Sequence, residues 1–400
     1  MVKTVSAEPQ TRGLARTAIV LFLVSLGLRP QIVAIGPLLP SMQADLGMSH
    51  AIAGLLGTIP VLCMGLFAPV GPWLGRRLGT ERAVAAGVAL ICVFGLLRTQ
   101  VLDAVPVLAL TFGLGVGIAL VGPLLPMIVR QRVPARAALV TGAYAAGIVL
   151  GATAAAALAV PLAGPELDWR RPLVLLTMVT VGSLVVWLAI ERPSSAQNRA
   201  DAPLPPRLPW RVSRAWTLAL LFGAQSTLFY AANAWLPTIY FERGWREADA
   251  GLLLALLNGM GLLTALGLPV LVERIGSRRQ QMLLSAGASL LGMVGIVLLP
   301  DLALAWVIVL GFGLGAVFPL VLSLPVDLAP RAADVGGLAA IMLFGGYLIS
   351  SAAPFMLGLV RDATGSFAAS LWVLVAVAAF LVAASWWFVP GGLGRPAAGR

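Results

Sequence analysis

Long apolar runs recur along almost the whole chain, separated by short segments that gather charged residues, Gly and Pro. A helix needs about 20 largely apolar residues to cross a hydrocarbon core of roughly 30 Å. The pattern predicts twelve membrane-spanning helices, at residues 17–40, 51–74, 83–99, 104–129, 137–161, 172–190, 215–240, 248–272, 280–299, 303–326, 334–359 and 368–389. The first span follows three basic residues, as a secretory signal would, but its apolar stretch exceeds the usual core of about 7–15 residues. We expect an uncleaved helix.

The two halves of the chain match each other at a fixed offset of 197 residues. The matches are Leu39-Pro40 with Leu236-Pro237, Gly47 with Gly244, AGLL at 53–56 with AGLL at 250–253, and Gly79 with Gly276. Such a repeat is typical of a duplicated helix bundle. Residues 191–214 are rich in Pro, Ser and Arg and cannot bury an apolar face, so they indicate a linker. We expect two six-helix bundles, at 1–190 and 215–400.

Composition and charge agree with a membrane protein. Hydrophobic residues make up 60% of the chain and charged residues 11%, with a mean hydropathy of +0.96, whereas soluble domains are roughly 45–50% apolar. Basic residues are retained on the cytoplasmic side of membranes, and with both termini inside, 20 of the 27 Lys and Arg fall on inner segments. The six outer ones are Arg98, Arg170, Arg171, Arg243, Arg246 and Arg361. The net charge of +11 therefore needs no nucleic-acid partner, and we expect a multi-pass protein of the inner (plasma) membrane with both termini in the cytoplasm.

The remaining basic residue, Arg29, lies inside the first span. It is twelve residues from Thr17, about 18 Å at 1.5 Å per residue, and so near the bilayer midplane. A charge there costs roughly 2.5–3.5 kcal/mol on insertion scales, so the guanidinium must face the bundle interior. All sixteen Asp and Glu residues fall in loops or at span ends. We therefore expect a substrate anion as the partner, since the guanidinium fork suits cyanate, a nitro group or a carboxylate. Carbonyl groups with water are the alternative.

Other polar side chains inside the spans extend this candidate site. The predicted substrate-binding residues are Arg29, Thr58, Tyr144, Tyr230, Asn233, Asn258 and Tyr347. Ser226, Tyr230 and Asn233 share one helical face, and Ser226 is the counterpart of Arg29 in the repeat. Hydrogen bonding between helices is the alternative role for Tyr230 and Asn233, and is favoured for the neighbouring Gln225.

Catalytic and metal-binding patterns are missing from the sequence. An intramembrane enzyme needs clustered His, carboxylates or metal ligands facing one chamber, and the chain has a single His, His50, before the second span. The glycine runs at 113–117 and 311–315 lie inside spans with no preceding strand, so helix packing is favoured over a dinucleotide loop. We expect no catalytic residue, no metal and no cofactor. Without a buried carboxylate, we expect uniport, exchange or cotransport of a proton carried by the substrate. Asp327, at the cytoplasmic end of the tenth span, is a less favoured candidate for carrying the proton.

The loops that follow the second and eighth spans are related by the repeat. They read GPWLGRRLGTER at 71–82 and LPVLVERIGSRR at 268–279. The second resembles the cytoplasmic loop motif of the major facilitator superfamily, in which a carboxylate can pair with a basic residue or cap a neighbouring helix N-terminus and so latch the halves on the inner side. The first departs from it, because Arg76 stands where the superfamily usually has Asp. The predicted gating residues are Arg76, Arg77, Gly79, Glu273, Arg274 and Gly276; a plain basic loop is the alternative.

Four segments narrow this resemblance to one branch. RPQIVAIGPLLPSM at 29–42, GRRLGTER at 75–82, LVTGAY at 139–144 and RAWTLALLFG at 214–223 together resemble the cyanate permease and nitroimidazole exporter branch. The resemblance implies an all-helical, twelve-helix transporter that rocks two halves around a central site. We expect a monomeric secondary transporter of a small anion, cyanate-like or a small carboxylate. The alternatives are an exporter of a neutral or weakly acidic xenobiotic such as a nitroimidazole and, from another class, an intramembrane enzyme.

Overall fold

The computed structural model describes residues 8–191, 208–272, 276–331 and 334–389, which form helices and the turns between them. The first half of the chain forms α1 (Glu8–Leu26), α2 (Pro30–Val33), α3 (Ile35–Leu46), α4 (His50–Phe67), α5 (Val70–Leu78), α6 (Thr80–Leu97), α7 (Ala104–Arg132), α8 (Ala137–Ala163) and α9 (Arg170–Ile190). The second half forms α11 (Ser213–Glu242), α12 (Glu247–Val272), α13 (Arg278–Leu298), α14 (Ala303–Leu328), α15 (Val335–Thr364) and α16 (Ala368–Phe388). Each predicted span corresponds to one of these helices or, in the first two spans, to an interrupted helix.

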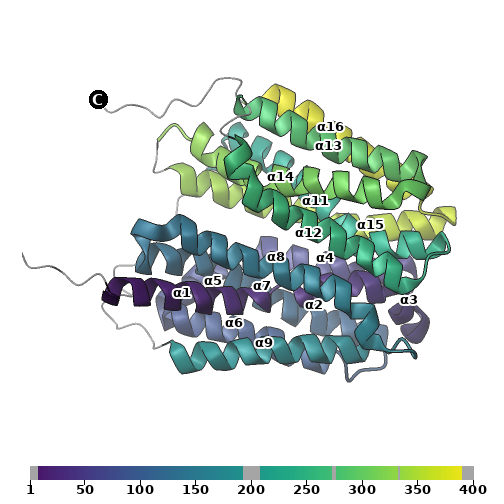
Figure 1. Cartoon of the computed structure of the whole chain (residues 1–400), viewed down its shortest axis with the longest axis horizontal. Helices are drawn as coiled ribbons and strands as arrows, with labels where there is room; N and C mark the ends of the chain where they lie inside the picture. Colours follow the sequence, from purple (N-terminus) through teal and green to yellow (C-terminus); the bar gives the residue numbers. More distant parts are fainter. Residues whose placement is uncertain (1–7, 192–207, 273–275, 332–333, 390–400) are drawn as a thin grey trace, which may run out of the picture.

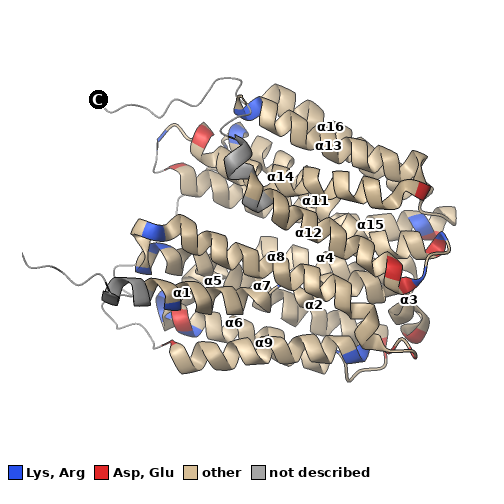
Figure 2. Ribbon diagram, in the orientation of Figure 1, with Lys and Arg blue, Asp and Glu red and all other residues tan. Residues whose placement is uncertain are grey.

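The helices run side by side in two halves, with α1 to α9 in the lower part of Figure 1 and α11 to α16 in the upper part. The halves meet where α4 packs against α15 and α8 against α12. Charged residues gather at the two ends of the bundle, and the middle is almost free of them (Figure 2). Ten helical segments of the described chain are long and apolar enough to cross a membrane. We call the end where α1 begins and α16 ends the termini face, and the other end the far face.

The first span is broken, which corrects the prediction of one continuous helix. α1 stops before Gly27–Arg29, and α2 begins at Pro30. Proline has no backbone N–H, so the hydrogen bond that residue 30 would donate to the Leu26 carbonyl is missing. Beyond the proline, the Arg29 carbonyl accepts the N–H groups of Ile32 and Val33, both at 3.0 Å. A broken helix inside a membrane needs such partners because lipid offers none, and Thr180 of α9 donates a further hydrogen bond to the Gly27 carbonyl at 3.4 Å.

The second span is also interrupted, at Pro69 between α4 and α5. Its helical path continues to Gly79, beyond the predicted end at 74. Gly79 has φ 97° and its repeat counterpart Gly276 has φ 34°, backbone conformations that favour glycine. The two matched glycines are therefore explained by the turns that they form.

A charged cluster joins the two halves at the far face. The Asp362 carboxylate of α15 accepts the backbone N–H of His50 at 3.0 Å and of Ala51 at 2.8 Å, so it caps the first turn of α4 from the other half. The two ring nitrogens of His50 lie 2.8 Å from Asp362 and 3.2 Å from Glu242. Arg361 Nε donates to both oxygens of Glu242 at 3.1 Å. We call His50, Glu242, Arg361 and Asp362 the far-face cluster; its contacts join the two halves at this face.

Asp362→Asn is expected to loosen the far face. The amide has one acceptor oxygen where the carboxylate has two, and a hydrogen bond to a charged group contributes roughly 1.5–3 kcal/mol. An Ala234→Cys reporter in a background with Cys63→Ala and Cys92→Ala should then react about tenfold faster with a membrane-impermeant maleimide applied to the far face, because Ala234 is buried between the halves at 9% exposure. Asp249→Asn is the control, because Asp249 contacts only Arg246 of its own segment, at 4.0 Å. An unchanged rate in Asp362→Asn would contradict the role of the cluster.

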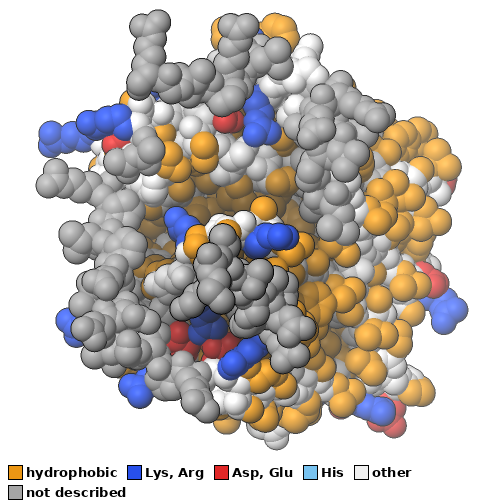
Figure 3. All heavy atoms as spheres, turned by 60° about the vertical axis from the view of Figure 1, so that its left-hand side comes forward, with side chains coloured by type: hydrophobic (Ala, Val, Ile, Leu, Met, Phe, Trp, Pro, Cys, Tyr) orange, Lys and Arg blue, Asp and Glu red, His pale blue; other side chains and the backbone are white. Residues whose placement is uncertain are grey.

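The termini face is open. Figure 3 turns this face forward and shows a hollow between the upper and lower halves, lined by hydrophobic side chains. Every ion pair described at this face stays within one half: Arg132 contacts Glu81 at 2.8 Å and Glu191 at 2.6 Å, Arg278 contacts Asp327 at 3.3 Å, and Arg331 contacts Asp334 at 3.0 Å.

The predicted gating loops form no described contact between the halves. Arg76 and Arg77 end α5, and the Arg77 guanidinium lies over the Trp73 ring at 4.4 Å. Glu273 and Arg274 fall outside the described residues. The carboxylate of the first loop that does pair with an arginine is Glu81, five residues beyond Arg76, and its partner Arg132 ends α7 of the same half.

Candidate functional site

The Arg29 side chain lies between the two halves. It comes from the break in the first span, and its Cζ is 5.6 Å from the centroid of the Tyr230 ring and 5.9 Å from that of Phe229, both on α11. Such contacts between a cation and an aromatic face are attractive. As a whole residue, Arg29 is half-buried.

Two tyrosines accompany this guanidinium. The Tyr230 hydroxyl interacts with both Arg29 and Tyr347 of α15, and the centroids of the two tyrosine rings are 6.3 Å apart. Tyr347 also packs edge-on against Phe222 at 5.1 Å. We call Arg29, Tyr230 and Tyr347 the Arg29 group. It presents hydrogen-bond donors from both halves at one place.

No carboxylate belongs to the Arg29 group within the described chain. The described Asp and Glu residues all lie at helix ends or in connecting turns, as the sequence predicted, and those in ion pairs contact other cations. The described part of the protein therefore surrounds this guanidinium with aromatic faces and hydroxyl groups and with no carboxylate.

The predicted asparagines contact each other. Asn258 Nδ2 of α12 donates to Asn233 Oδ1 at 3.1 Å and to the Leu254 carbonyl at 3.0 Å, and Asn233 Nδ2 donates to the Phe229 carbonyl at 2.9 Å. Both side chains are 4% exposed. This pair fits the alternative role of hydrogen bonding between neighbouring helices.

Thr58 and Tyr144 have no described contact with the Arg29 group. Thr58 Oγ1 accepts the backbone N–H of Phe355 at 3.2 Å, which ties α4 to α15. Tyr144 packs against the apolar cluster of the first half, with Arg130 as an electrostatic neighbour. Ser226, the repeat counterpart of Arg29, donates to Gln225 Oε1 at 3.2 Å.

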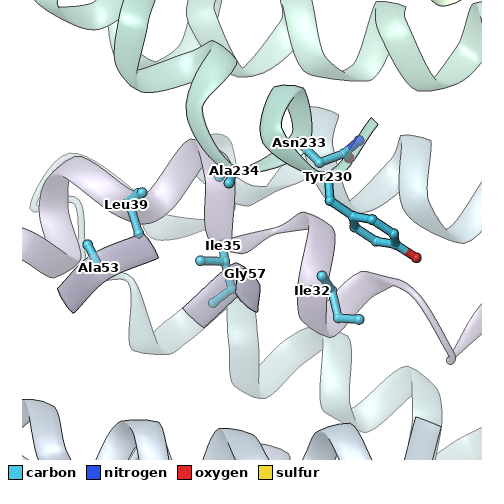
Figure 4. A pocket seen from close by; sticks show the side chains of 9 residues that line it. Ile32, Ile35, Leu39, Ala53, Gly57, Tyr230, Asn233 and Ala234 are labelled. Carbon is cyan, nitrogen blue, oxygen red and sulfur yellow. The ribbon is translucent and has the colours of Figure 1, made fainter. Parts of the chain in front are cut away.

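A narrow void adjoins the site on the side of α3 and α4. Tyr230 and Asn233 line it together with apolar residues of the first two spans (Figure 4): Ile32, Ile35, Gly36, Leu39, Ala53, Gly57 and Ala234 of α11. Its volume of about 10 Å³ is room for the centre of about one water molecule. Because the halves pack closely toward the far face, we expect a solute to reach the Arg29 group from the hollow of the termini face.

The sequence did not predict that another arginine, Arg98, is buried. Arg98 follows α6, and its position after an apolar run placed it among the outer loop residues. In the structure it is fully buried, with 0% exposure. Its Nη2 donates to the Gln31 carbonyl at 2.8 Å and to Gln31 Oε1 at 2.6 Å. The one sequence signal was Gln31 itself, a second polar residue next to Arg29 in the same span.

Comparison with known proteins places this geometry in a family. The model of the Major Facilitator Superfamily matches residues 17–354. The cyanate transport protein CynX of Escherichia coli K12 is 32% identical over 350 residues, which cover 87% of this chain and 91% of that protein. The 2-nitroimidazole transporter of the same organism is 31% identical over 373 residues, covering 91% and 92%.

Solved structures share the fold at low sequence identity. The inward open xylose transporter XylE from E. coli has a TM-score of 0.79 at 13% identity, covering 94% of this chain and 97% of that one. The nucleoside transporter NupG has a TM-score of 0.76 at 14% identity, covering 93% and 99%. Because the family model matches most of its length, this chain belongs to the Major Facilitator Superfamily of membrane transporters and is not an enzyme.

Proposed function

We propose that this transporter carries a small anion by alternating access and that Arg29 binds the anion. The observation that supports this is the position of the guanidinium between the halves, with aromatic and hydroxyl neighbours and no carboxylate within the described chain. An unpaired charge inside a membrane costs roughly 2.5–3.5 kcal/mol. An anionic substrate offsets that cost each time it binds.

The Arg29 group offers the donors that a small acceptor needs. The guanidinium donates two parallel hydrogen bonds to a carboxylate-like partner, and the hydroxyls of Tyr230 and Tyr347 come from α11 and α15. A substrate that contacts Arg29 and both tyrosines bridges the two halves. We assign the main binding role to these three residues, with Asn233, Asn258 and Thr58 supporting helix packing and Tyr144 lying further along the path.

Export of a nitroimidazole is the second candidate. A nitro group presents two oxygen acceptors to a guanidinium, and the Phe222, Phe229, Tyr230 and Tyr347 rings around Arg29 suit a flat heterocycle. Two of the matched relatives are named for cyanate and for 2-nitroimidazole. Cyanate and the nitro group share one property: each offers a guanidinium hydrogen-bond acceptors only.

The proposed cycle moves the bundles 1–190 and 215–400 against each other. The excess of basic residues near the termini face supports a cytoplasmic location of that face in the plasma membrane. The structure then represents the inward-open state, with the far-face cluster as the closed outer gate. The loops around Arg76, Arg77, Gly79 and Gly276, with Glu273 and Arg274, would approach each other when the inner side closes.

Uptake into proteoliposomes distinguishes the candidates. Labelled cyanate, nitrate, acetate and 2-nitroimidazole are offered in turn, with a potassium gradient and valinomycin setting the membrane potential. Saturable cyanate or acetate uptake that an interior-positive potential accelerates would support an anion carrier, because net negative charge then enters. Saturable uptake of 2-nitroimidazole alone, insensitive to the potential, would favour the exporter. Absence of saturable uptake for all four compounds in protein that remains folded would contradict both.

A further inference from the structure

We propose that Arg98 is a positioning residue that holds the broken first span in place from inside the first half and thereby sets the location of Arg29. The consequence for transport rests on the proposed function. The structural consequence, a fixed conformation at Gly27–Ala34, does not.

The contact is buried and short. Arg98 and Gln31 both have 0% exposure. Arg98 Nη2 donates to the Gln31 carbonyl at 2.8 Å and to Gln31 Oε1 at 2.6 Å. Gln31 Nε2 continues the chain of hydrogen bonds to Thr177 Oγ1 at 2.8 Å and to the Leu173 carbonyl at 3.2 Å. Gln31 is thus fastened to both α6 and α9.

The Gln31 carbonyl has a reason to take an outside donor. It lies in α2, a helix of four residues, and the last four carbonyls of any helix lack an N–H partner within that helix. In lipid such a carbonyl needs a donor from another part of the protein. The guanidinium of Arg98 supplies it, and bonds to an ionised donor are stronger than neutral ones.

Burying the Arg98 guanidinium costs free energy, which argues against a role in packing alone. Its Nε and Nη1 atoms are buried without a described hydrogen-bond partner, and no ion pair of the described chain includes it. A buried polar group without partners destabilises the fold, so an apolar side chain of similar length would pack at lower cost. What only the guanidinium provides is the pair of bonds to Gln31.

The contact bears directly on Arg29, which precedes Gln31 by two residues. The bond to the preceding part of the break, from Thr180 Oγ1 to the Gly27 carbonyl, is longer, at 3.4 Å. If Gln31 is released, the segment can shift, and Arg29 no longer keeps its 5.6 Å separation from the Tyr230 ring. The two arginines therefore act on one short segment: Arg98 holds it from the core of its half, and Arg29 projects from it toward the other half.

Hydrogen exchange of the full-length protein tests the structural claim. In Arg98→Met, the amides of Ile32, Val33 and Ala34, which now donate to Arg29 and Pro30, should exchange about tenfold faster or more, the factor for one lost charge-assisted bond. Arg98→Lys keeps a charged donor and should show a smaller increase. If Arg98→Met does not fold, Gln31→Met serves instead; it removes the side-chain acceptor of Arg98 and the side-chain donor to Thr177 and Leu173. Arg246→Met is the control, because Arg246 is 82% exposed. Unchanged exchange at these amides would overturn the proposal.

Transport kinetics test the link to Arg29. With labelled cyanate in proteoliposomes, Arg98→Lys should raise KM about tenfold and change kcat per folded molecule much less, because misplacing a binding group weakens binding. A purely structural role would lower the amount of folded protein and leave KM unchanged, which would overturn the link. If Arg29→Gln transports cyanate normally, the proposed function fails, while the exchange experiment still decides whether Arg98 holds the break.

Discussion

Arg29→Gln is expected to abolish saturable anion transport, and Arg29→Lys to retain only a small fraction of it. The guanidinium donates two hydrogen bonds in a fixed plane, whereas an ammonium is a point charge that does not reproduce this geometry. Each hydrogen bond to a charged group contributes roughly 1.5–3 kcal/mol, so losing two lowers kcat/KM by about a hundredfold or more. Initial rates of cyanate and acetate uptake into proteoliposomes provide the measurement.

The unfolding temperature distinguishes a variant that has lost the binding site from one that no longer folds. Removing the charge at Arg29 relieves an insertion cost of roughly 2.5–3.5 kcal/mol, so Arg29→Gln should unfold at a temperature no lower than the parent protein. Arg171→Gln is the matched control, because Arg171 is exposed at the far face. Parental KM and kcat in Arg29→Gln would remove Arg29 from the site.

Gly54→Leu is expected to prevent closure of the far face and to lower transport by at least about a hundredfold. A Cβ atom at Gly54 would lie 2.3 Å from the Pro354 carbonyl oxygen of the other half, and one at Gly36 would lie 2.1 Å from the Asn233 carbonyl oxygen. Backbone atoms cannot rotate away as a side chain can, and overpacking typically costs about 1–3 kcal/mol or more. The contact lies between α4 and α15, so separating the halves relieves it while the first half can still fold.

The accessibility of Ala234→Cys reports the conformation of Gly54→Leu. A membrane-impermeant maleimide at the far face should label it rapidly in Gly54→Leu and slowly in the parent. Gly182→Leu on α9 is the control, because no atom lies within 4 Å of a Cβ built there. Normal transport by Gly54→Leu, or slow labelling, would show that the halves do not close at this contact.

The membrane-spanning helices could be predicted from the sequence because a membrane helix satisfies its own backbone hydrogen bonds. Length and apolarity therefore located spans that correspond to the helices of the described chain, ten of which meet both criteria. The failures within them occurred at prolines: Pro30 and Pro69 divide spans that the apolar pattern treats as continuous. Hydropathy carries no information about a missing N–H, or about which neighbours donate hydrogen bonds to the carbonyls of the break, as Thr180 does to Gly27.

The candidate site could be predicted only in part from the sequence. Helical periodicity placed Tyr230 and Asn233 on one face of α11, but it does not tell which helix that face meets. Tyr230 therefore lies beside Arg29, whereas Asn233 bonds Asn258, and Thr58 bonds the backbone of α15. These outcomes depend on how the two halves dock.

By itself, the sequence determined that this protein is a helical membrane transporter with a charge in its first span and carboxylates confined to its helix ends, since length, composition and order along the chain carry those properties. The tertiary structure alone decided that Arg98 is buried against Gln31, that Asp362 caps α4 and that Tyr347 joins Arg29. Each of these contacts joins residues that are far apart in the chain or on different helices, and packing between helices, which local periodicity does not encode, brings them together.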